Sequence, residues 1–177
     1  MRSLGGAALP GLVAAVVSWL MACDHGLPAS PPQTGISGRI TFTGAWPDDV
    51  AEVAVAVYEE LPAEPIDLLR IKGWDTQVQL HVDSYDYLVP VEHGGTYRWV
   101  VVAWHREGGS WDFTSLLGCH HTPGDSLPTP VAIRPGEIAA GVDIAVDFGV
   151  LRGETIPGHD VCLRPLPPEL VDLAGSP

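Results

Sequence analysis

Apolar and polar side chains alternate with a period of two over most of the chain from residue 36 onward. This period is typical of β-strands that bury one face and expose the other to water. Turn-forming Gly, Pro, Asp and His residues separate the alternating runs. The pattern predicts seven strands, at residues 36–42, 53–57, 78–82, 85–89, 97–104, 131–133 and 142–148.

No segment has a long apolar stripe with the 3.6-residue period of a packed helix. Only a short helical turn at residues 66–71 and a short helix at residues 168–173 are expected. Short strands with almost no helix favour the all-β class. We therefore predict an antiparallel Greek-key sandwich over residues 36–149, followed by a Pro-rich C-terminal tail at residues 150–177.

The strand predicted at residues 97–104 departs from simple alternation because it is apolar on both faces. We place Tyr97 on the buried face, which leaves an apolar stripe on the opposite, outward face. The stripe consists of Val100, Val102 and Trp104. Such a stripe needs a cover. We prefer a cover from within the chain, either the loop around Trp74 or the tail from Val150, and an interface with another molecule is the alternative.

The first 22 residues have the features of a secretory signal. Arg2 is followed by an uncharged run that ends in a short hydrophobic stretch, Leu12–Leu20. Cys23 then follows a small residue, as in bacterial lipoprotein signals. We expect removal of residues 1–22 and lipid on Cys23. The Pro- and Gly-rich residues 23–35 would form a tether between the membrane and the sandwich.

Two other interpretations of this N-terminal segment stay open. An uncleaved transmembrane helix would need about 20 predominantly apolar residues, whereas Pro10 and several glycines interrupt the run. An ordinary secreted protein with a free Cys23 is the second alternative. With lipid on Cys23, the protein would be bound to a membrane of the cell envelope, outside the cytoplasm.

The charge of the chain excludes one class of partner. The chain has nine basic and 22 acidic side chains. Because Arg2 is the only charged residue in the predicted signal, the mature chain would have eight basic and 22 acidic side chains, a net charge of −14. Nucleic acids bind surfaces with an excess of Lys and Arg. A nucleic-acid partner is therefore excluded.

Two stretches of the chain resemble a known family. They are Ile36-Ser37-Gly38-Arg39-Ile40-Thr41-Phe42 and the segment that runs from Tyr85-Asp86-Tyr87-Leu88-Val89 through His93-Gly94-Gly95 to Tyr97-Arg98-Trp99-Val100. Both are similar to carboxypeptidase regulatory-like modules with a transthyretin-like (prealbumin-like) fold. The resemblance implies that fold over roughly residues 36–149 and a non-catalytic accessory or binding role. We expect Gly94 and Gly95 to supply positive φ in a turn between two paired strands.

The sequence contains none of the common catalytic motifs. It has no Gly-x-Ser-x-Gly, no phosphate-binding loop, no dinucleotide-binding glycine pattern and no His-Glu-x-x-His. Asp143 and Asp147 share the outward face of the last predicted strand, where solvated carboxylates are expected rather than an acid–base pair across a cleft. We predict that the protein is not an enzyme. An envelope hydrolase, or an accessory subunit of one, is the remaining catalytic hypothesis.

Tryptophan residues raise the hypothesis of carbohydrate binding, because an indole ring can stack on a sugar. The candidates are Trp46, Trp74, Trp99, Trp104 and Trp111. A sandwich of this size also uses tryptophan to fill its core, which is the explanation we prefer. An envelope protein or a glycan is the candidate partner.

Cys119 and Cys162 would both lie in an oxidising compartment, and we predict a disulfide between them. The bond would bring three histidines together, His120, His121 and His159. Neutral imidazoles are common ligands of zinc and copper. With reduced cysteines, two thiolates and two imidazoles would form a tetrahedral zinc site instead. Solvated histidines without a metal are the simpler alternative.

The leading interpretation is a lipid-anchored, non-catalytic binding or accessory module of the cell envelope. A periplasmic metal-binding protein that uses the His-rich loop is the alternative hypothesis, with zinc or copper as its cofactor.

Overall fold

The computed structural model describes residues 33–111, 115–164, 166–167 and 170. These residues belong to the second of two compact units, Pro32–Pro177. The first unit, Met1–Pro31, lies outside the described residues, and with it the predicted signal and Cys23. Within the described ranges, no helix has the length and apolar character needed to cross a bilayer.

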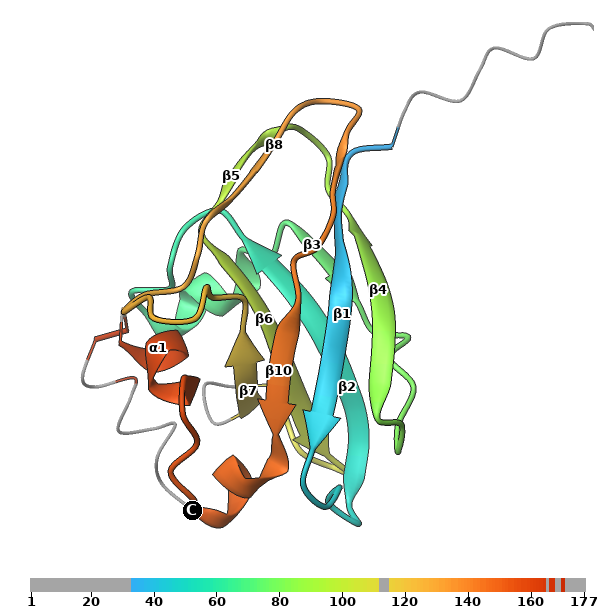
Figure 1. Cartoon of the computed structure of the whole chain (residues 1–177), viewed down its shortest axis with the longest axis vertical. Coiled ribbons are helices and arrows are strands. Elements are labelled where there is room, and N and C mark those ends of the chain that lie inside the picture. The colour runs from blue at the N-terminus through green and yellow to red at the C-terminus, as the bar shows by residue number, and fades with distance from the viewer. Residues whose placement is uncertain (1–32, 112–114, 165, 168–169, 171–177) are drawn as a thin grey trace, which may run out of the picture. The chain divides into compact units, whose positions relative to one another are not determined.

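One sheet, here called sheet A, has the strand order β10-β1-β4 (Figure 1). Its strands are β1 (Gly35–Thr43), β4 (Ser84–Pro90), β10 (Ile144–Asp147) and the short β9 (Ile138–Ala139). β1 is antiparallel to β4 and parallel to both β10 and β9. β1 is therefore the central strand of sheet A, and β4 is an edge strand.

The second sheet, sheet B, has the strand order β3-β2-β6-β7, and its neighbours are all antiparallel. Its strands are β2 (Val50–Tyr58), β3 (Gly73–Asp75), β6 (Trp99–Arg106) and β7 (Leu116–Cys119). The ladder of β2 and β6 forms its centre. A separate two-stranded ribbon pairs β5 (Gly95–Tyr97) with β8 (Val131–Ile133).

The main hydrophobic core lies between sheets A and B. Alternate residues of β1, β2, β4 and β6 supply its fully buried side chains, among them Ile36, Ile40, Val53, Val55, Val57, Val89, Val100 and Val102. Two glycines sit where strands of the two sheets approach closely. A Cβ atom on Gly118 of β7 would lie 2.7 Å from the carbonyl oxygen of Ala145 in β10, and Gly73 of β3 lies against Pro90 of β4 in the same way.

The C-terminal segment covers part of the outer face of sheet B. It contains the 3-10 helix η4 (Phe148–Arg152) and the short helix α1 (His159–Leu163). A second buried cluster joins this segment to the sheet through Ala56, Tyr58, Trp99, Val101, Leu116, Cys119, Cys162, Leu166 and Leu170. Because both faces of β6 are buried, its sequence is apolar at consecutive positions.

The structure confirms an all-β architecture of sheets packed around a common core. The strands predicted at residues 36–42, 53–57, 85–89 and 131–133 coincide with β1, β2, β4 and β8. The strand predicted at residues 78–82 is wrong. His81 adopts φ 59°, a left-handed conformation that a strand cannot contain, and Val78 is buried in the core from an irregular connection.

Two expectations about strand pairing are also wrong. The sandwich is not purely antiparallel, because the chain returns to sheet A in β10 with the same direction as β1. Gly94 and Gly95 do not join paired strands, since β4 belongs to sheet A and β6 to sheet B. Neither glycine has a positive φ. A Cβ atom on Gly94 would instead lie 2.6 Å from Cδ of Pro135, so this glycine permits a close approach of two chain segments.

The helical turn expected at residues 66–71 is present as the 3-10 helix η2 (Pro65–Leu69). The carboxylate of Asp67 accepts hydrogen bonds from the backbone N–H groups of Ala63 and Glu64, at 3.0 and 3.1 Å, and so closes the first turn. The helix predicted at residues 168–173 lies mostly outside the described residues.

Candidate functional site

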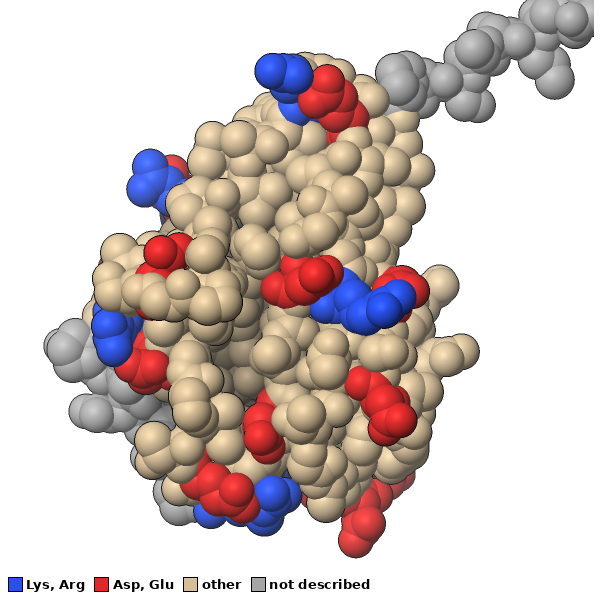
Figure 2. Space-filling view, in the orientation of Figure 1, with Lys and Arg blue, Asp and Glu red and all other residues tan. Residues whose placement is uncertain are grey.

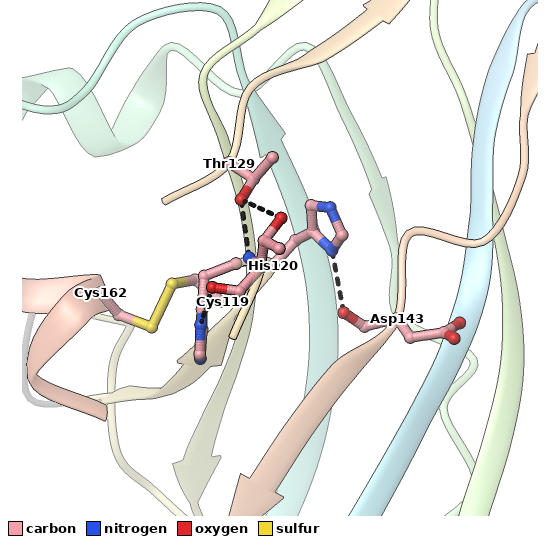
Figure 3. The surroundings of a disulfide bond; sticks show 7 residues. Cys119, His120, Thr129, Asp143 and Cys162 are labelled. Carbon is pink, nitrogen blue, oxygen red and sulfur yellow. Dashed lines mark hydrogen bonds between the residues drawn. A yellow bond between two sulfur atoms is a disulfide. The ribbon is translucent and has the colours of Figure 1, made fainter. Parts of the chain in front are cut away.

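Cys119 in β7 and Cys162 in α1 form the predicted disulfide (Figure 3). Their Cα atoms are 5.5 Å apart, and both side chains are buried. The bond joins residues 43 positions apart in the sequence. It fixes α1 on the outer face of sheet B and therefore has the position of a structural cross-link.

Two histidines that follow Cys119 make separate local contacts. The ring of His120 points away from the disulfide in Figure 3, and its Nδ1 lies 2.9 Å from the carbonyl oxygen of Asp143. Nδ1 of His121 lies 3.4 Å from the carbonyl oxygen of Thr122, while its Nε2 is close to Gly158. The two imidazoles thus have different neighbours.

His159, the third predicted metal ligand, is largely buried at the start of α1. Burial lowers the pKa of its imidazole, and this effect outweighs the hydrogen bond with the Leu117 backbone and the nearby Asp160 carboxylate. Its Nδ1 atom is buried without a hydrogen-bond partner. In the described part of the chain, no group of three His, Cys, Asp or Glu side chains is placed to hold a metal ion. The zinc or copper site expected at His120, His121 and His159 is therefore not formed in this structure.

The predicted interface stripe faces the opposite direction from the one expected. Val100, Val102 and Trp104 are buried in the core between the sheets, and Trp104 is only 5% exposed. Trp99 and Val101 are the residues that face outward, and the C-terminal segment covers them. The physical reason is the break between β5 and β6 at Arg98, which shifts the alternation after Tyr97. Val100, Val102 and Trp104 are thus buried against the opposite sheet and not under the loop around Trp74 or the tail from Val150, and the tail covers Trp99 and Val101 instead.

The candidate tryptophans divide between core and surface. Trp46 packs against Phe42 and Phe148, with ring centroids 4.7 and 4.5 Å away. Trp74 is 58% exposed on the edge strand β3, and Trp111 is also exposed. Trp74 is the most exposed of the five, and the adjacent Asp75 accepts the Tyr85 hydroxyl at 3.3 Å.

The two carboxylates singled out on the last predicted strand have structural roles. Oδ1 of Asp143 accepts the backbone N–H of Arg39 at 2.8 Å. Oδ1 of Asp147 accepts the N–H of Gly149 at 2.8 Å and caps η4. They bind different parts of the backbone and do not face each other across a cleft.

A hollow of about 330 Å³ lies between the end of β2 and the segment after η2. We call it the Glu59 hollow. Tyr58, Leu61 and Ile71 supply its apolar lining, and charged residues stand at its rim. Beside it, Ile66 and Leu69 of η2 are 56% and 77% exposed. The hollow thus combines apolar and charged side chains at one surface.

The charged residues around the Glu59 hollow are paired. Glu59 contacts Lys72 Nζ at 3.1 Å and His93 Nε2 at 2.7 Å. The hydrogen bond from Lys72 is the main cause of the lowered pKa of Glu59, followed by the one from His93. Asp67 pairs with Arg70 at 3.1 Å. The rim therefore carries ionised carboxylates at neutral pH.

Tyr58 connects the hollow to the buried cluster beneath it. Its hydroxyl donates a hydrogen bond to the carbonyl oxygen of Leu68 at 3.1 Å, and its ring packs on Trp99. Burial raises the pKa of Tyr58 to about 12. The phenol is therefore neutral at physiological pH and serves as a fixed wall of the hollow.

A second, shallower hollow of about 380 Å³ lies on the outer face of sheet A. There the Arg39 guanidinium makes two hydrogen bonds to Asp86, at 2.7 and 3.0 Å. The hydrogen bond from Arg39 is the main cause of the lowered pKa of Asp86. Figure 2 shows acidic and basic side chains next to each other on this face, between broad uncharged areas. The positive charge of Arg39 is therefore balanced by the carboxylate of Asp86.

The Glu59 hollow was not predicted from the sequence, because residues 61–74 were interpreted as a connection. One signal was available. Ile66 and Leu69 are three residues apart, so a 3-10 turn places both side chains on one face. Neither of them continues the strand alternation into the core, so both side chains are left at the surface beside the hollow.

Comparisons with known proteins gave no match to any family model, to any curated protein or to any solved structure.

Proposed function

We propose that the protein is a lipid-anchored, non-catalytic binding module of the cell envelope. The buried disulfide between Cys119 and Cys162 is the observation that carries this proposal. Disulfides persist in oxidising compartments outside the cytoplasm and are rare within it. An export signal at residues 1–22 agrees with such a compartment, and Cys23 is the acceptor for the lipid.

The tether agrees with a module held close to a membrane. In an extended, Pro-rich conformation a chain rises about 3.1 Å per residue, so 12 residues reach up to ~37 Å. Residues 24–35 would reach that far in such a conformation, and β1 begins at Gly35. The sandwich would then meet its partner within the envelope, at a limited distance from the bilayer.

The Glu59 hollow supports binding rather than catalysis. General acid–base catalysis works best with a pKa near the operating pH. The pKa values of Glu59 and Asp67 are lowered instead, because each carboxylate accepts hydrogen bonds. An apolar floor beneath paired charges suits an envelope protein or a glycan that presents both apolar and polar groups.

We also propose a Greek-key, transthyretin-like topology for the sandwich. The chain passes from one sheet to the other after β1, β3, β4 and β7. Repeated crossing between two packed sheets is the feature that Greek-key sandwiches share. The paths β10-β1-β4 and β3-β2-β6-β7 form the two packed sheets, and the short strands β5, β8 and β9 lie outside these paths.

Metabolic labelling with a palmitate analogue, followed by membrane fractionation in a bacterial host, tests the anchor. The wild-type chain should carry the label and sediment with membranes, whereas Cys23→Ser should lose the label and become soluble or stay unprocessed. Ser30→Ala, a change of similar size in the same tether, is the control and should behave like wild type. Equal membrane partitioning of Cys23→Ser and wild type would contradict the anchor.

A further inference from the structure

The edge of sheet A at β4 has a regular pattern of backbone hydrogen bonds. β4 pairs with β1 along its whole length, from Gly35↔Pro90 to Thr41↔Ser84, without a bulge. Beyond the two ends of this ladder, the N–H of Val91 donates to the carbonyl of Thr34, and the N–H of Phe42 donates to that of Asp83. In an antiparallel ladder, hydrogen-bonded and non-hydrogen-bonded pairs alternate.

The register therefore shows, for each residue of β4, whether its backbone N–H and C=O groups point toward β1 or away from it. The hydrogen-bonded pairs are Ile36↔Val89, Gly38↔Tyr87 and Ile40↔Tyr85. Ser84, Asp86 and Leu88 occupy the non-hydrogen-bonded pairs, so their N–H and C=O groups point away from β1.

The opposite side of β1 agrees with this assignment. The N–H of Gly35 donates to the carbonyl of Glu137, and the carbonyl of Ser37 accepts the N–H of Val142. Gly35 and Ser37 belong to the non-hydrogen-bonded pairs with β4. Their backbone groups point toward β9 and β10, as the alternation requires.

The outward groups of β4 have no backbone partner among the described residues. None of the backbone hydrogen bonds found there involves Ser84, Asp86 or Leu88. All three side chains are exposed, and Leu88 is 40% exposed. β3 packs beside β4, with Gly73 against Pro90 and the Asp75 carboxylate accepting the Tyr85 hydroxyl, and none of the backbone hydrogen bonds found among the described residues joins β3 or the connection after it to the outward groups of β4.

β4 also lacks most of the devices that protect natural edge strands. Such strands are commonly short, bulged, or carry lysine or proline within them. β4 has seven residues, no bulge and no lysine, and its only proline is the last residue, Pro90. The single charge on it, Asp86, is held by Arg39.

The charges near this edge indicate which charge a partner strand should carry. Asp75 accepts the Tyr85 hydroxyl at 3.3 Å, Asp83 directly precedes β4, and Glu92 follows it. Arg39 is already bonded to Asp86. A second copy of this acidic chain would place carboxylates opposite carboxylates, which destabilises a strand pair. An extended segment with Lys or Arg would meet complementary charge.

We propose that the free edge of β4 binds an extended, basic segment of a partner protein as an added strand of sheet A. Strand addition uses backbone hydrogen bonds for affinity and alternate side chains for specificity. The outward groups of Ser84, Asp86 and Leu88 would form the new ladder, and Leu88 would contact an apolar residue of the added strand. This inference rests on the proposed function as a binding module and names its partner class.

Amide hydrogen exchange by NMR, on the full chain in detergent micelles, tests the backbone pattern. In the free protein, the amides of Ser84, Asp86 and Leu88 should exchange fast and those of Tyr85 and Tyr87 slowly. The probe is the peptide acetyl-Lys-Val-Lys-Thr-Lys-Val-Lys-amide. It should protect the fast set and leave the slow set unchanged. Protection elsewhere, or no protection, overturns the proposal.

Two variants of Leu88 distinguish the contribution of its backbone N–H to peptide binding from that of its side chain. Leu88→Pro removes one outward N–H but no bond to β1, so the sheet should stay folded in a thermal melt. It should weaken peptide binding by about tenfold or more, whereas Leu88→Ala should stay within about threefold of wild type. Equal binding by Leu88→Pro and Leu88→Ala would overturn the proposal.

Two further probes keep the test decisive if Leu88→Pro fails to fold. A peptide N-methylated at alternate residues should not bind wild type, and a peptide with Glu in place of Lys should bind more weakly. Sedimentation of the free protein as a dimer through β4 would show a second copy as the occupant and overturn the assignment. Failure of lipidation at Cys23 would not alter these exchange rates, so the two proposals fail independently.

Discussion

Trp104 of β6 lies opposite Val53 of β2, and both side chains are buried between the two sheets. From this pair to Tyr58↔Trp99 the register of β2 and β6 is regular, so the two faces of the ladder alternate along it. Val100 and Val102 share the face of Trp104, and Trp99 and Val101 face the C-terminal segment. Between Trp99 and Val102 each residue of β6 therefore belongs either to the main core or to the second cluster, and Trp104 belongs to the main core.

Replacement of Trp104 by alanine should lower the free energy of unfolding by about 3–5 kcal/mol, because it removes a large buried side chain and leaves a cavity. Urea unfolding measures the change. Trp74→Ala is the matched control, since Trp74 is 58% exposed, and it should stay within about 0.5 kcal/mol of wild type. A stable Trp104→Ala protein would contradict the burial described for this ladder.

The sequence predicted most strands but not how the faces of β6 are oriented. Alternation identifies a strand from its own residues, and β1, β2 and β4 are found in this way. The orientation of Val100 depends on one irregular residue, Arg98, between β5 and β6. Such an irregularity is set by contacts between distant segments, and no local pattern encodes it. The parallel pairing of β1 with β10 is likewise a property of chain routing.

The disulfide could be predicted from compartment and cysteine count, whereas the Glu59 hollow could not. Glu59 and Lys72 are 13 residues apart, and only the return of the chain into β3 brings them within 3.1 Å. The metal hypothesis relied on three histidines that lie close to the two cysteines in the sequence. Their position in the sequence does not determine where their rings point, and the ring of His120 turns toward the Asp143 carbonyl oxygen.

Removal of the disulfide by the double change Cys119→Ser, Cys162→Ser should lower the free energy of unfolding by about 4 kcal/mol. This value is the loop-closure entropy for a separation of 43 residues. Urea unfolding with and without reductant measures it. Reductant should destabilise wild type by a similar amount and leave the double variant unchanged. An effect of reductant on the double variant would contradict this account.

Gly38 permits the close approach of β1 to the chain before β10. A Cβ atom at this position would overlap the carbonyl oxygen of Val142, which also accepts the Tyr87 hydroxyl at 2.5 Å. Gly38→Ala should therefore lower the free energy of unfolding by about 1–3 kcal/mol. Gly95→Ala is the control, since nothing lies within 4 Å of a Cβ atom there. Thermal melts in which both variants match wild type would disprove the close approach.

The largely buried His159 should make stability depend on pH. Burial lowers the pKa of the folded imidazole, whereas in the unfolded chain it titrates near its ordinary pKa of about 6.5. Below that pH the unfolded state binds a proton that the folded state resists. The contribution is therefore fully present above about pH 6.5 and is lost as the pH falls through the lowered folded pKa.

Urea unfolding of wild type and His159→Leu at pH 7.5 and pH 5.5 isolates this effect. Wild type should lose more free energy of unfolding between the two pH values than the variant does, because leucine binds no proton. Asp160, whose pKa is lowered by its hydrogen bond with Arg164, stays ionised over this range in both proteins. An identical pH dependence in the two proteins would show that His159 titrates equally in the folded and unfolded states, and its burial against Leu117 would then be wrong.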